Sequence, residues 1–215
     1  MPFLNLLSFL QHRLALGLLA LWLALLAAPA GAQTLRFQQA LSAVGDGDTF
    51  PESAATRTVS LPDDWARSRP GLTGGQWYRL SFDAPGAGDP NALMALAIER
   101  VCSTLKVRLN GQLVHQAGRL VEPVSMNCYR PHLVTLPAAL LQARGNVLDI
   151  HVVGFALEAV STRQRAGGLS VVELGPQALL AEAHAVRTAQ SVTVPQVMSG
   201  SLVLLGSFMF LMGWI

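Results

Sequence analysis

Apolar and polar residues alternate in short runs through the middle of the chain, whereas both ends are continuously apolar. Between residues 76 and 84, Tyr78, Leu80 and Phe82 share one side, which is the period of a half-buried strand. Trp77 and Arg79 lie on the other side. Similar runs, separated by glycine and proline, occur at 56–61, 105–109, 112–115, 132–136, 146–154 and 168–174. The more continuously apolar run 91–101 is compatible with a strand or a helix, and its strand neighbours favour a strand.

The sharpest local signal is Asn110-Gly111, which stands between two alternating runs. Both residue types tolerate a positive φ, and the resulting turn matches the twist of the flanking strands, so a β-hairpin is expected here. Seven or eight short strands without a long amphipathic helix predict an all-β fold of two packed antiparallel sheets over residues 33–175.

The pattern becomes helical after Pro176, with Leu179, Leu180, Ala183 and Val186 on one side. Proline suits the first turn of a helix, where its missing N–H costs nothing. We interpret residues 176–193 as a juxtamembrane helix and linker that ends near a kink at Pro195. A mechanical connection and a passive spacer fit this segment equally well.

The C-terminal segment Gln196–Ile215 carries no charge. A helix of about 20 such residues is about 30 Å long, which matches a hydrocarbon core. A soluble helix that is apolar on every side would need protein all round it. The pattern therefore predicts a first transmembrane helix at 194–215, and we expect the natural chain to continue beyond Ile215.

The N-terminal segment has the parts of a secretory signal peptide. Arg13 precedes the uncharged run Leu14–Ala28, and the small residues of Ala30-Gly31-Ala32 suit a signal peptidase. We predict cleavage after Ala32, which makes 1–32 a signal peptide and exports the β unit. An uncleaved anchor helix is the alternative, although a run of about 15 residues is short for a bilayer.

Only two cysteines occur, Cys102 and Cys128, and both lie in the segment expected to reach an oxidising compartment. A disulfide between them would close a loop of roughly 25 residues and stabilise the fold by roughly 3 kcal/mol. A pair of small buried thiols is the alternative. We expect the disulfide.

Charge and motif content exclude several functions. The net charge is only +2, without a lysine or arginine cluster, so no nucleic-acid partner is expected. No serine elbow, phosphate loop or dinucleotide fingerprint occurs, and no cofactor is expected. The histidines lack metal-like spacing, so no metal site is expected. The carboxylates available for a glycosidase pair stand in no recognisable motif, and we expect no catalytic residues; they are Asp63, Asp64, Glu99, Glu122 and Glu158.

The order of several short motifs resembles a known family. These motifs are Leu61-Pro62-Asp63-Asp64-Trp65, Gly75-Gln76-Trp77-Tyr78-Arg79, Val107-Arg108-Leu109-Asn110-Gly111 and Gly145-Asn146-Val147-Leu148. Over residues 61–174 they resemble the galactose-binding-like jelly roll that serves as the sugar-binding domain of many β-glycosidases. Trp65 and Tyr78 would then fill the core, and Asn110-Gly111 would form a turn.

The same sandwich followed by membrane helices is similar to the periplasmic front of bacterial seven-transmembrane receptors with diverse intracellular signalling modules. In its pairing of Cys102 with the Asn127-Cys128-Tyr129 segment, the chain is similar to a subset of proteobacterial sensor kinases. The resemblance implies a periplasmic sensory input domain. It would belong to a receptor that is anchored in the inner membrane and acts as a homodimer. The output module implied is a histidine kinase, with a diguanylate cyclase as the alternative.

Two further functions stay open: a membrane-tethered carbohydrate-binding module, and a scaffold that only dimerises receptors. The ligand would be a small molecule, such as a carbohydrate or carboxylate, or a periplasmic protein. An aromatic face beside hydrogen-bonding groups suits sugars and carboxylates. The candidate binding residues chosen on this ground are Trp77, Glu99, Arg119, Tyr129 and Arg130. The competing interpretation, in which Trp77 covers a sheet face and the arginines are solvated, is favoured for these residues.

Overall fold

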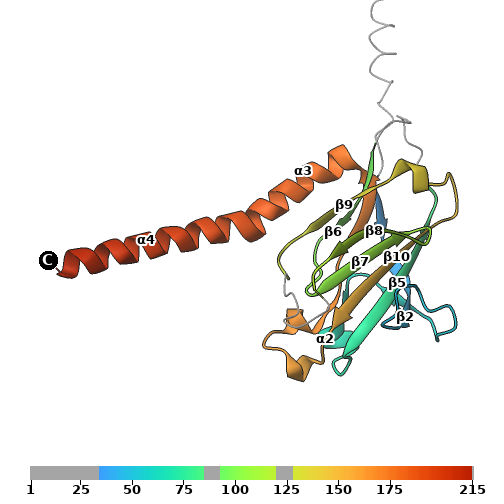
Figure 1. Cartoon of the computed structure of the whole chain (residues 1–215), viewed down its shortest axis with the longest axis horizontal. Helices are drawn as coiled ribbons and strands as arrows, with labels where there is room; N and C mark the ends of the chain where they lie inside the picture. Colours follow the sequence, from blue (N-terminus) through green and yellow to red (C-terminus); the bar gives the residue numbers. More distant parts are fainter. Residues whose placement is uncertain (1–33, 85–92, 120–127, 215) are drawn as a thin grey trace, which may run out of the picture. The chain divides into compact units, whose positions relative to one another are not determined.

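A computed structural model describes residues 34–84, 93–119 and 128–214 (Figure 1). The predicted signal peptide lies outside these ranges and stays a prediction. The strands are β1 (Leu35–Phe37), β2 (Gln39–Val44), β3 (Arg57–Ser60), β4 (Asp63–Asp64), β5 (Gly74–Phe82), β6 (Met94–Ile98), β7 (Thr104–Leu109), β8 (Gln112–Ala117), β9 (His132–Leu136), β10 (Asn146–Gly154), β11 (Gly168–Leu169) and β12 (Val172–Pro176). The helices are α2 (Trp65–Ser68), α3 (Gln177–Thr188), the π-helical η4 (Ala189–Thr193) and α4 (Val194–Trp214), with 3-10 turns η1 (Ala138–Leu140), η2 (Leu157–Ala159) and η3 (Arg163–Ala166).

Two antiparallel sheets form a β-sandwich. One sheet has the strand order β1-β12-β6-β9, and the other has the order β3-β2-β5-β10-β7-β8. From β5 onward the chain passes repeatedly from one sheet to the other, so that β5, β7 and β10 lie in the larger sheet while β6, β9 and β12 lie in the smaller one. Such crossing between two sheets is the jelly-roll arrangement. The predicted all-β jelly-roll sandwich is confirmed.

The core lies between the two sheets and is built by strand alternation. On β5, Tyr78, Leu80 and Phe82 are buried in the main core cluster. Trp65 joins the same cluster from α2 and is fully buried, as is Tyr78. The structural roles expected for Trp65 and Tyr78 are therefore confirmed.

The hairpin between β7 and β8 forms at the predicted place. Asn110 and Gly111 have φ angles of 50° and 82°, the left-handed values that this turn requires. The Asn110 side chain also holds neighbouring segments, because its Nδ2 donates to the Leu140 carbonyl at 2.7 Å and its Oδ1 accepts from the Val147 N–H at 2.8 Å. The turn is thus fixed to the rest of the sandwich.

Two predicted strands differ in outcome. Within run 91–101 the structure forms strand β6, whose residues are all buried, so the choice of strand over helix is confirmed. The single strand expected at Gly168–Leu174 is wrong, because the chain makes two strands there. β11 pairs with β4, whereas β12 pairs with β1 and β6. Alternation within one run could not reveal that its two halves have different partners.

Helix α3 covers the outer face of the smaller sheet. Leu180 is buried against Ala95 and Ala97 of β6, and the half-buried Leu133 of β9 packs on the same cluster. Two alanines with small side chains allow the helix to approach the strand closely. This contact, which we call the helix face, is the place where the sandwich meets the C-terminal helix (Figure 1).

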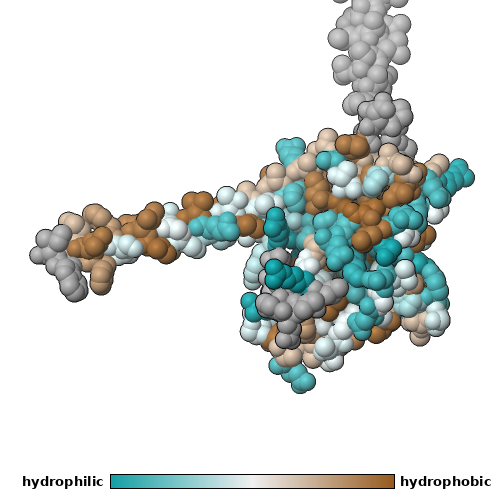
Figure 2. All heavy atoms as spheres, viewed as in Figure 1, coloured by the Kyte–Doolittle hydropathy of each residue, from teal (hydrophilic) through white to brown (hydrophobic). Residues whose placement is uncertain are grey.

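The C-terminal helix continues without a break from Gln177 to Gly213, a stretch of 37 residues that is long and apolar enough to cross a membrane. Figure 2 shows its apolar side chains on the surface of α4. The expected boundary near Pro195 is a π-helical turn, in which the Val194 N–H donates to the Ala189 carbonyl. Proline has no N–H to donate, and a π turn next to it is one way for a helix to accommodate that loss.

Candidate functional site

Two neighbouring hollows lie on either side of Pro62, Arg100 and Ser170, and the smaller of them also borders the C-terminal helix. The smaller hollow, which we call the helix pocket, has a volume of about 400 Å³. It is lined by Pro62, Glu99, Arg100, Cys128, Tyr129, Pro131, Ser170, Val171, Arg187, Gln190 and Ser191. A cavity of this size is within the range of ligand sites.

The helix pocket joins loops of the sandwich to the C-terminal helix. Glu99 follows β6, and Tyr129 precedes β9 with an exposed fraction of 67%. The opposite wall contains Arg187 from α3 and Gln190 and Ser191 from η4. A small molecule held between these walls would contact the helix that continues into the apolar segment.

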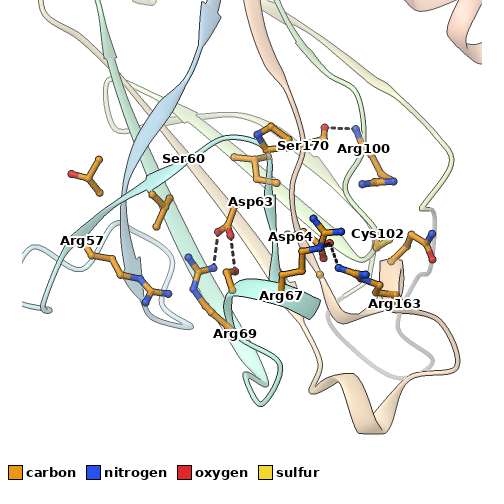
Figure 3. Close-up of a pocket in the computed structure, with 18 residues that line it drawn as sticks. Arg57, Ser60, Asp63, Asp64, Arg67, Arg69, Arg100, Cys102, Arg163 and Ser170 are labelled. Carbon is orange, nitrogen blue, oxygen red and sulfur yellow. Dashed lines mark hydrogen bonds and ion pairs between the residues drawn. The ribbon is translucent and has the colours of Figure 1, made fainter.

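The larger hollow, which we call the arginine pocket, has a volume of about 830 Å³ (Figure 3). Its charged lining residues are Arg57, Arg67, Arg69, Arg100, Arg163, Asp63 and Asp64. It shares Pro62, Arg100 and Ser170 with the helix pocket. The Ser170 Oγ accepts a hydrogen bond of 2.6 Å from the Arg100 backbone N–H, which fixes this shared boundary.

A buried polar network forms one wall of the arginine pocket. Asp63 Oδ2 accepts hydrogen bonds from the Tyr78 hydroxyl at 2.8 Å and from Arg69 Nη1 at 2.7 Å. The Tyr78 hydroxyl in turn accepts from Trp65 Nε1 at 2.6 Å, and Ser68 Oγ donates to Asp63 Oδ1 at 2.7 Å. The pKa of Tyr78 is raised mainly by burial of its hydroxyl and, to a smaller extent, by the negative charge of Asp63. The hydroxyl therefore stays protonated and can keep donating to Asp63.

The neighbouring Asp64 organises the exposed part of this wall. Its Oδ1 accepts from the Ala66 N–H at 3.1 Å and caps helix α2, while its Oδ2 lies 3.0 Å from Arg163 Nη2 and 3.9 Å from Arg67 Nε. Both aspartates are thus held by arginines. This pairing gives both aspartates structural roles in the wall of the arginine pocket.

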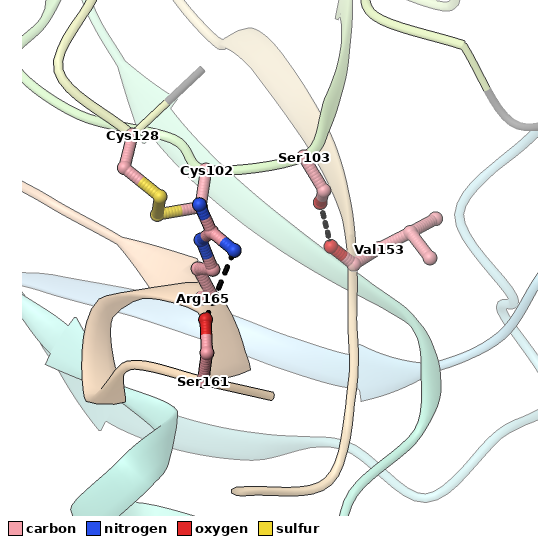
Figure 4. The surroundings of a disulfide bond; sticks show 6 residues. All are labelled: Cys102, Ser103, Cys128, Val153, Ser161 and Arg165. Carbon is pink, nitrogen blue, oxygen red and sulfur yellow. Dashed lines mark hydrogen bonds between the residues drawn. A yellow bond between two sulfur atoms is a disulfide. The ribbon is translucent and has the colours of Figure 1, made fainter. Parts of the chain in front are cut away.

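A disulfide joins Cys102 to Cys128, as predicted (Figure 4). Cys102 lines the arginine pocket, whereas Cys128 lines the helix pocket. The Ser103 hydroxyl next to it donates to the Val153 carbonyl of β10, which ties this segment to the larger sheet. The disulfide therefore stands between the two hollows and restrains the loops that form them.

The structure separates the five predicted binding residues. Glu99 and Tyr129 meet in the helix pocket. Arg130 is exposed beside Tyr129 but lines neither hollow, and Arg119 lies after β8 and also lines neither. The prediction for Trp77 is wrong, because its side chain is fully buried and offers no face to a ligand.

Trp77 is covered by the segment that follows β2. It packs against Ala43 and Phe50, and its ring centroid lies 4.7 Å from that of His151. Arg79, on the same side of β5, makes a bidentate contact with Asp149 at 2.7 and 2.9 Å and reaches Glu52 at 2.7 Å. We call this outer surface of the larger sheet the loop face. Trp77 therefore has a packing role on this face of the sheet.

Sequence reasoning missed the arginines of the larger hollow. Arg57, Arg67 and Arg69 recur within one short stretch, and that spacing was the one local signal available. Arg100 and Arg163 reach the same hollow only through the fold. Isolated arginines at strand ends are usually solvated, so their convergence is not visible in the sequence.

Two histidines meet where the edges of the two sheets approach each other. The rings of His115 on β8 and His132 on β9 have centroids 5.9 Å apart. Burial, together with the charges of His115 and Arg130, lowers the pKa of His132 to about 4. Within the described ranges, no group of three or more histidine, cysteine, aspartate or glutamate residues is placed to hold a metal ion.

No protein-family model matches the sequence, and no curated protein matches it. Solved structures of glycosidases do match: a β-glucuronidase of Faecalibacterium prausnitzii is 16% identical with a TM-score of 0.47, over 70% of this chain and 32% of that enzyme. The GH2 β-galacturonidase of Eisenbergiella tayi, bound to galacturonate, is 15% identical with a TM-score of 0.47, over 67% and 24%. A β-glycosidase of Bacteroides vulgatus is 20% identical with a TM-score of 0.47, over 66% and 20%.

The chain thus spans between a fifth and a third of the length of these enzymes. At such identities and TM-scores the likeness assigns neither an activity nor a ligand. The functional conclusion depends on the pockets and the C-terminal helix.

Proposed function

We propose that this chain is the extracytoplasmic sensory input region of a membrane-bound signalling receptor, and that a ligand in the hollows changes the position of the C-terminal helix. The output is proposed to be a histidine kinase, with a diguanylate cyclase as the alternative. The periplasmic location and the inner-membrane anchor belong to the same proposal.

One observation carries the proposal: Glu99 and Tyr129 of the sandwich and Arg187 and Gln190 of the helix line the same pocket. A ligand shifts an equilibrium only by the difference in its affinity for the two states. A pocket with walls on both parts supplies such a difference, because its shape changes when the helix moves against the sheet.

The helix face is suited to such movement. Leu180 is the one buried residue of α3, and it packs against two alanines and the half-buried Leu133. Sliding of packed helices over small distances is a common element of switching transitions. Because the helix is continuous from Gln177 to Gly213, a displacement at α3 would extend into the apolar segment.

A distance measurement tests the proposal. Ser81 on β5 and Glu182 on α3 are both exposed, and the two native cysteines are joined to each other. Spin labels on the double variant S81C/E182C, in the full chain reconstituted in lipid nanodiscs, report the distance between sandwich and helix. Probes are first selected by thermal shift from sugars, carboxylates and peptides.

The expected result is a shifted or newly bimodal distance when a selected probe saturates the protein. Matched variants R187A and Q190A should reduce that shift without altering the unliganded distance. A probe that binds but leaves the distance unchanged contradicts the sensor. A neutral sugar that behaves in this way would favour the tethered carbohydrate-binding module.

A further inference from the structure

Positive charge is concentrated in the arginine pocket. Five arginines line it against two aspartates, which leaves a local charge of +3, whereas the whole chain carries only +2. The remainder of the chain is therefore close to neutral or slightly acidic. Such a concentration in a concave site attracts anions because low-dielectric walls focus the field.

The two aspartates neutralise only some of these arginines. Asp63 pairs with Arg69, and Asp64 pairs with Arg163 and, at longer range, with Arg67. Arg57 and Arg100 form no ion pair or side-chain hydrogen bond with any residue that the structure describes. Figure 3 shows them well separated, with Asp63 between them. Two free guanidinium groups thus stand on different sides of one hollow.

Arg69 shows that this hollow is more than a group of solvated side chains. Its side chain is only 7% exposed, and its Nη1 is held by Asp63. Its Nε and Nη2 are buried and have no acceptor among the described residues. A buried donor without an acceptor costs roughly 1–3 kcal/mol. An anion in the pocket, or a water molecule that it holds, would supply the missing acceptor.

We propose that the arginine pocket binds an extended polyanion, a molecule whose carboxylate or phosphate groups are spaced widely enough for one to pair with Arg57 and another with Arg100. The planar guanidinium matches carboxylate and phosphate oxygens in bidentate geometry, which favours these groups over neutral sugars. The volume of about 830 Å³ accommodates a molecule of this kind. The inference deepens the proposed function, on which it rests for the choice of this region as the sensing site.

Isothermal titration calorimetry on the full chain tests the inference. The chain is purified in a neutral polyoxyethylene detergent, which contains no sugar headgroup. A short oligoglutamate and linear inorganic polyphosphate are the polyanionic probes and separate the carboxylate source from the phosphate source, while acetate and galactose are the controls. The variants are R57Q, R100Q and the double variant, with R144Q as the matched control, because Arg144 is exposed and lies outside both hollows.

We expect oligoglutamate, polyphosphate or both to bind at low ionic strength, with acetate much weaker and galactose giving no binding signal. R57Q and R100Q should each weaken binding about 10-fold and the double variant about 100-fold, and R144Q should leave it nearly unchanged. Added salt should weaken binding in the wild type. Circular dichroism checks that each variant is folded.

Absence of binding by both polyanions would overturn the inference. An equal loss of polyanion affinity in R144Q would also overturn it, and so would galactose binding that is retained in the double variant R57Q/R100Q. The spin-label distance separates this inference from the proposed function. Polyanion binding that depends on Arg57 and Arg100 without a helix shift supports the site and contradicts the sensor. A helix shift caused by galactose alone supports the sensor and contradicts the polyanion site.

Discussion

The two outer faces of the sandwich are covered in different ways. On the loop face, Trp77 is fully buried, and Arg79 binds Asp149 and Glu52 while its guanidinium stacks 3.9 Å above the Phe50 ring. The hydrogen bonds to Asp149 raise the pKa of Arg79 further. On the helix face, Leu180 rests on two alanines. The loop face has directional contacts that fix its cover, whereas the helix face has few.

This difference assigns separate tasks to the two faces. A cover held by a buried aromatic ring and ion pairs opens only at high cost, and it belongs to the stable part of the fold. A helix that buries only one leucine against a sheet should cost less to displace. The helix pocket borders this helix directly, and the arginine pocket adjoins the helix pocket through Pro62, Arg100 and Ser170.

The largest expected effect is that of W77A on the loop face. Removal of a fully buried tryptophan leaves a cavity and should lower the free energy of unfolding by about 4 kcal/mol. Chemical denaturation monitored by circular dichroism measures the loss. L113A is the control, because Leu113 is 48% exposed and should change stability little. Equal effects of the two variants would show that the loop face is loosely packed.

The next effect is that of R79A, which should cost about 3 kcal/mol because it leaves the buried Asp149 carboxylate without its partner. R36A provides the contrast, since the Arg36 side chain is 56% exposed and its ion pair with Glu173 is screened by solvent. Denaturation of both variants tests whether burial of the carboxylate decides the outcome. A similar loss for both would contradict that view.

On the helix face, L180A should release α3 without unfolding the sandwich. Amide hydrogen exchange in α3 should accelerate about 30-fold, which corresponds to about 2 kcal/mol of lost docking energy. Exchange in β5 and β10 should stay at the wild-type rate. V186A is the matched control, because Val186 is 52% exposed on the same helix. Faster exchange in all strands would indicate that α3 is part of the global core.

The smallest expected effect is a pH dependence that comes from His132. The pKa of His132 is about 4 in the folded protein, whereas an unperturbed histidine has a pKa of 6.5. On acidification the unfolded state therefore takes up the proton first. Stability should therefore fall between pH 6.5 and 4, by up to about 2 kcal/mol after allowance for solvent screening. H132N should show a shallower decline in pH-dependent denaturation. An identical slope would mean that His132 does not resist protonation.

Much of the fold follows from local patterns in the sequence. Alternation in β5 placed Tyr78, Leu80 and Phe82 in the core, and Asn110-Gly111 gave the hairpin, because both depend on neighbouring residues. The predicted strand Asn146–Gly154 coincides with β10. The disulfide was also expected, since a chain predicted to be exported and carrying two cysteines has one possible pairing.

The site was less accessible because it depends on contacts distant in sequence. Alternation placed Trp77 on the outer side of β5, but it could not show that Phe50 would cover it. Arg57, Arg100 and Arg163 come from three remote segments that converge at one hollow. Glu99 and Tyr129, chosen as a hydrogen-bonding group and an aromatic face, do line one pocket, and their role in binding stays a prediction.

The account depends most on the side of the membrane on which the sandwich lies, and reporter fusions after Gln190 measure this directly. Alkaline phosphatase joined at this point should be active and β-galactosidase joined there should be inactive, because the sandwich is expected outside the cytoplasm. Active β-galactosidase together with inactive alkaline phosphatase would place the two pockets in the cytosol and contradict the extracytoplasmic sensor.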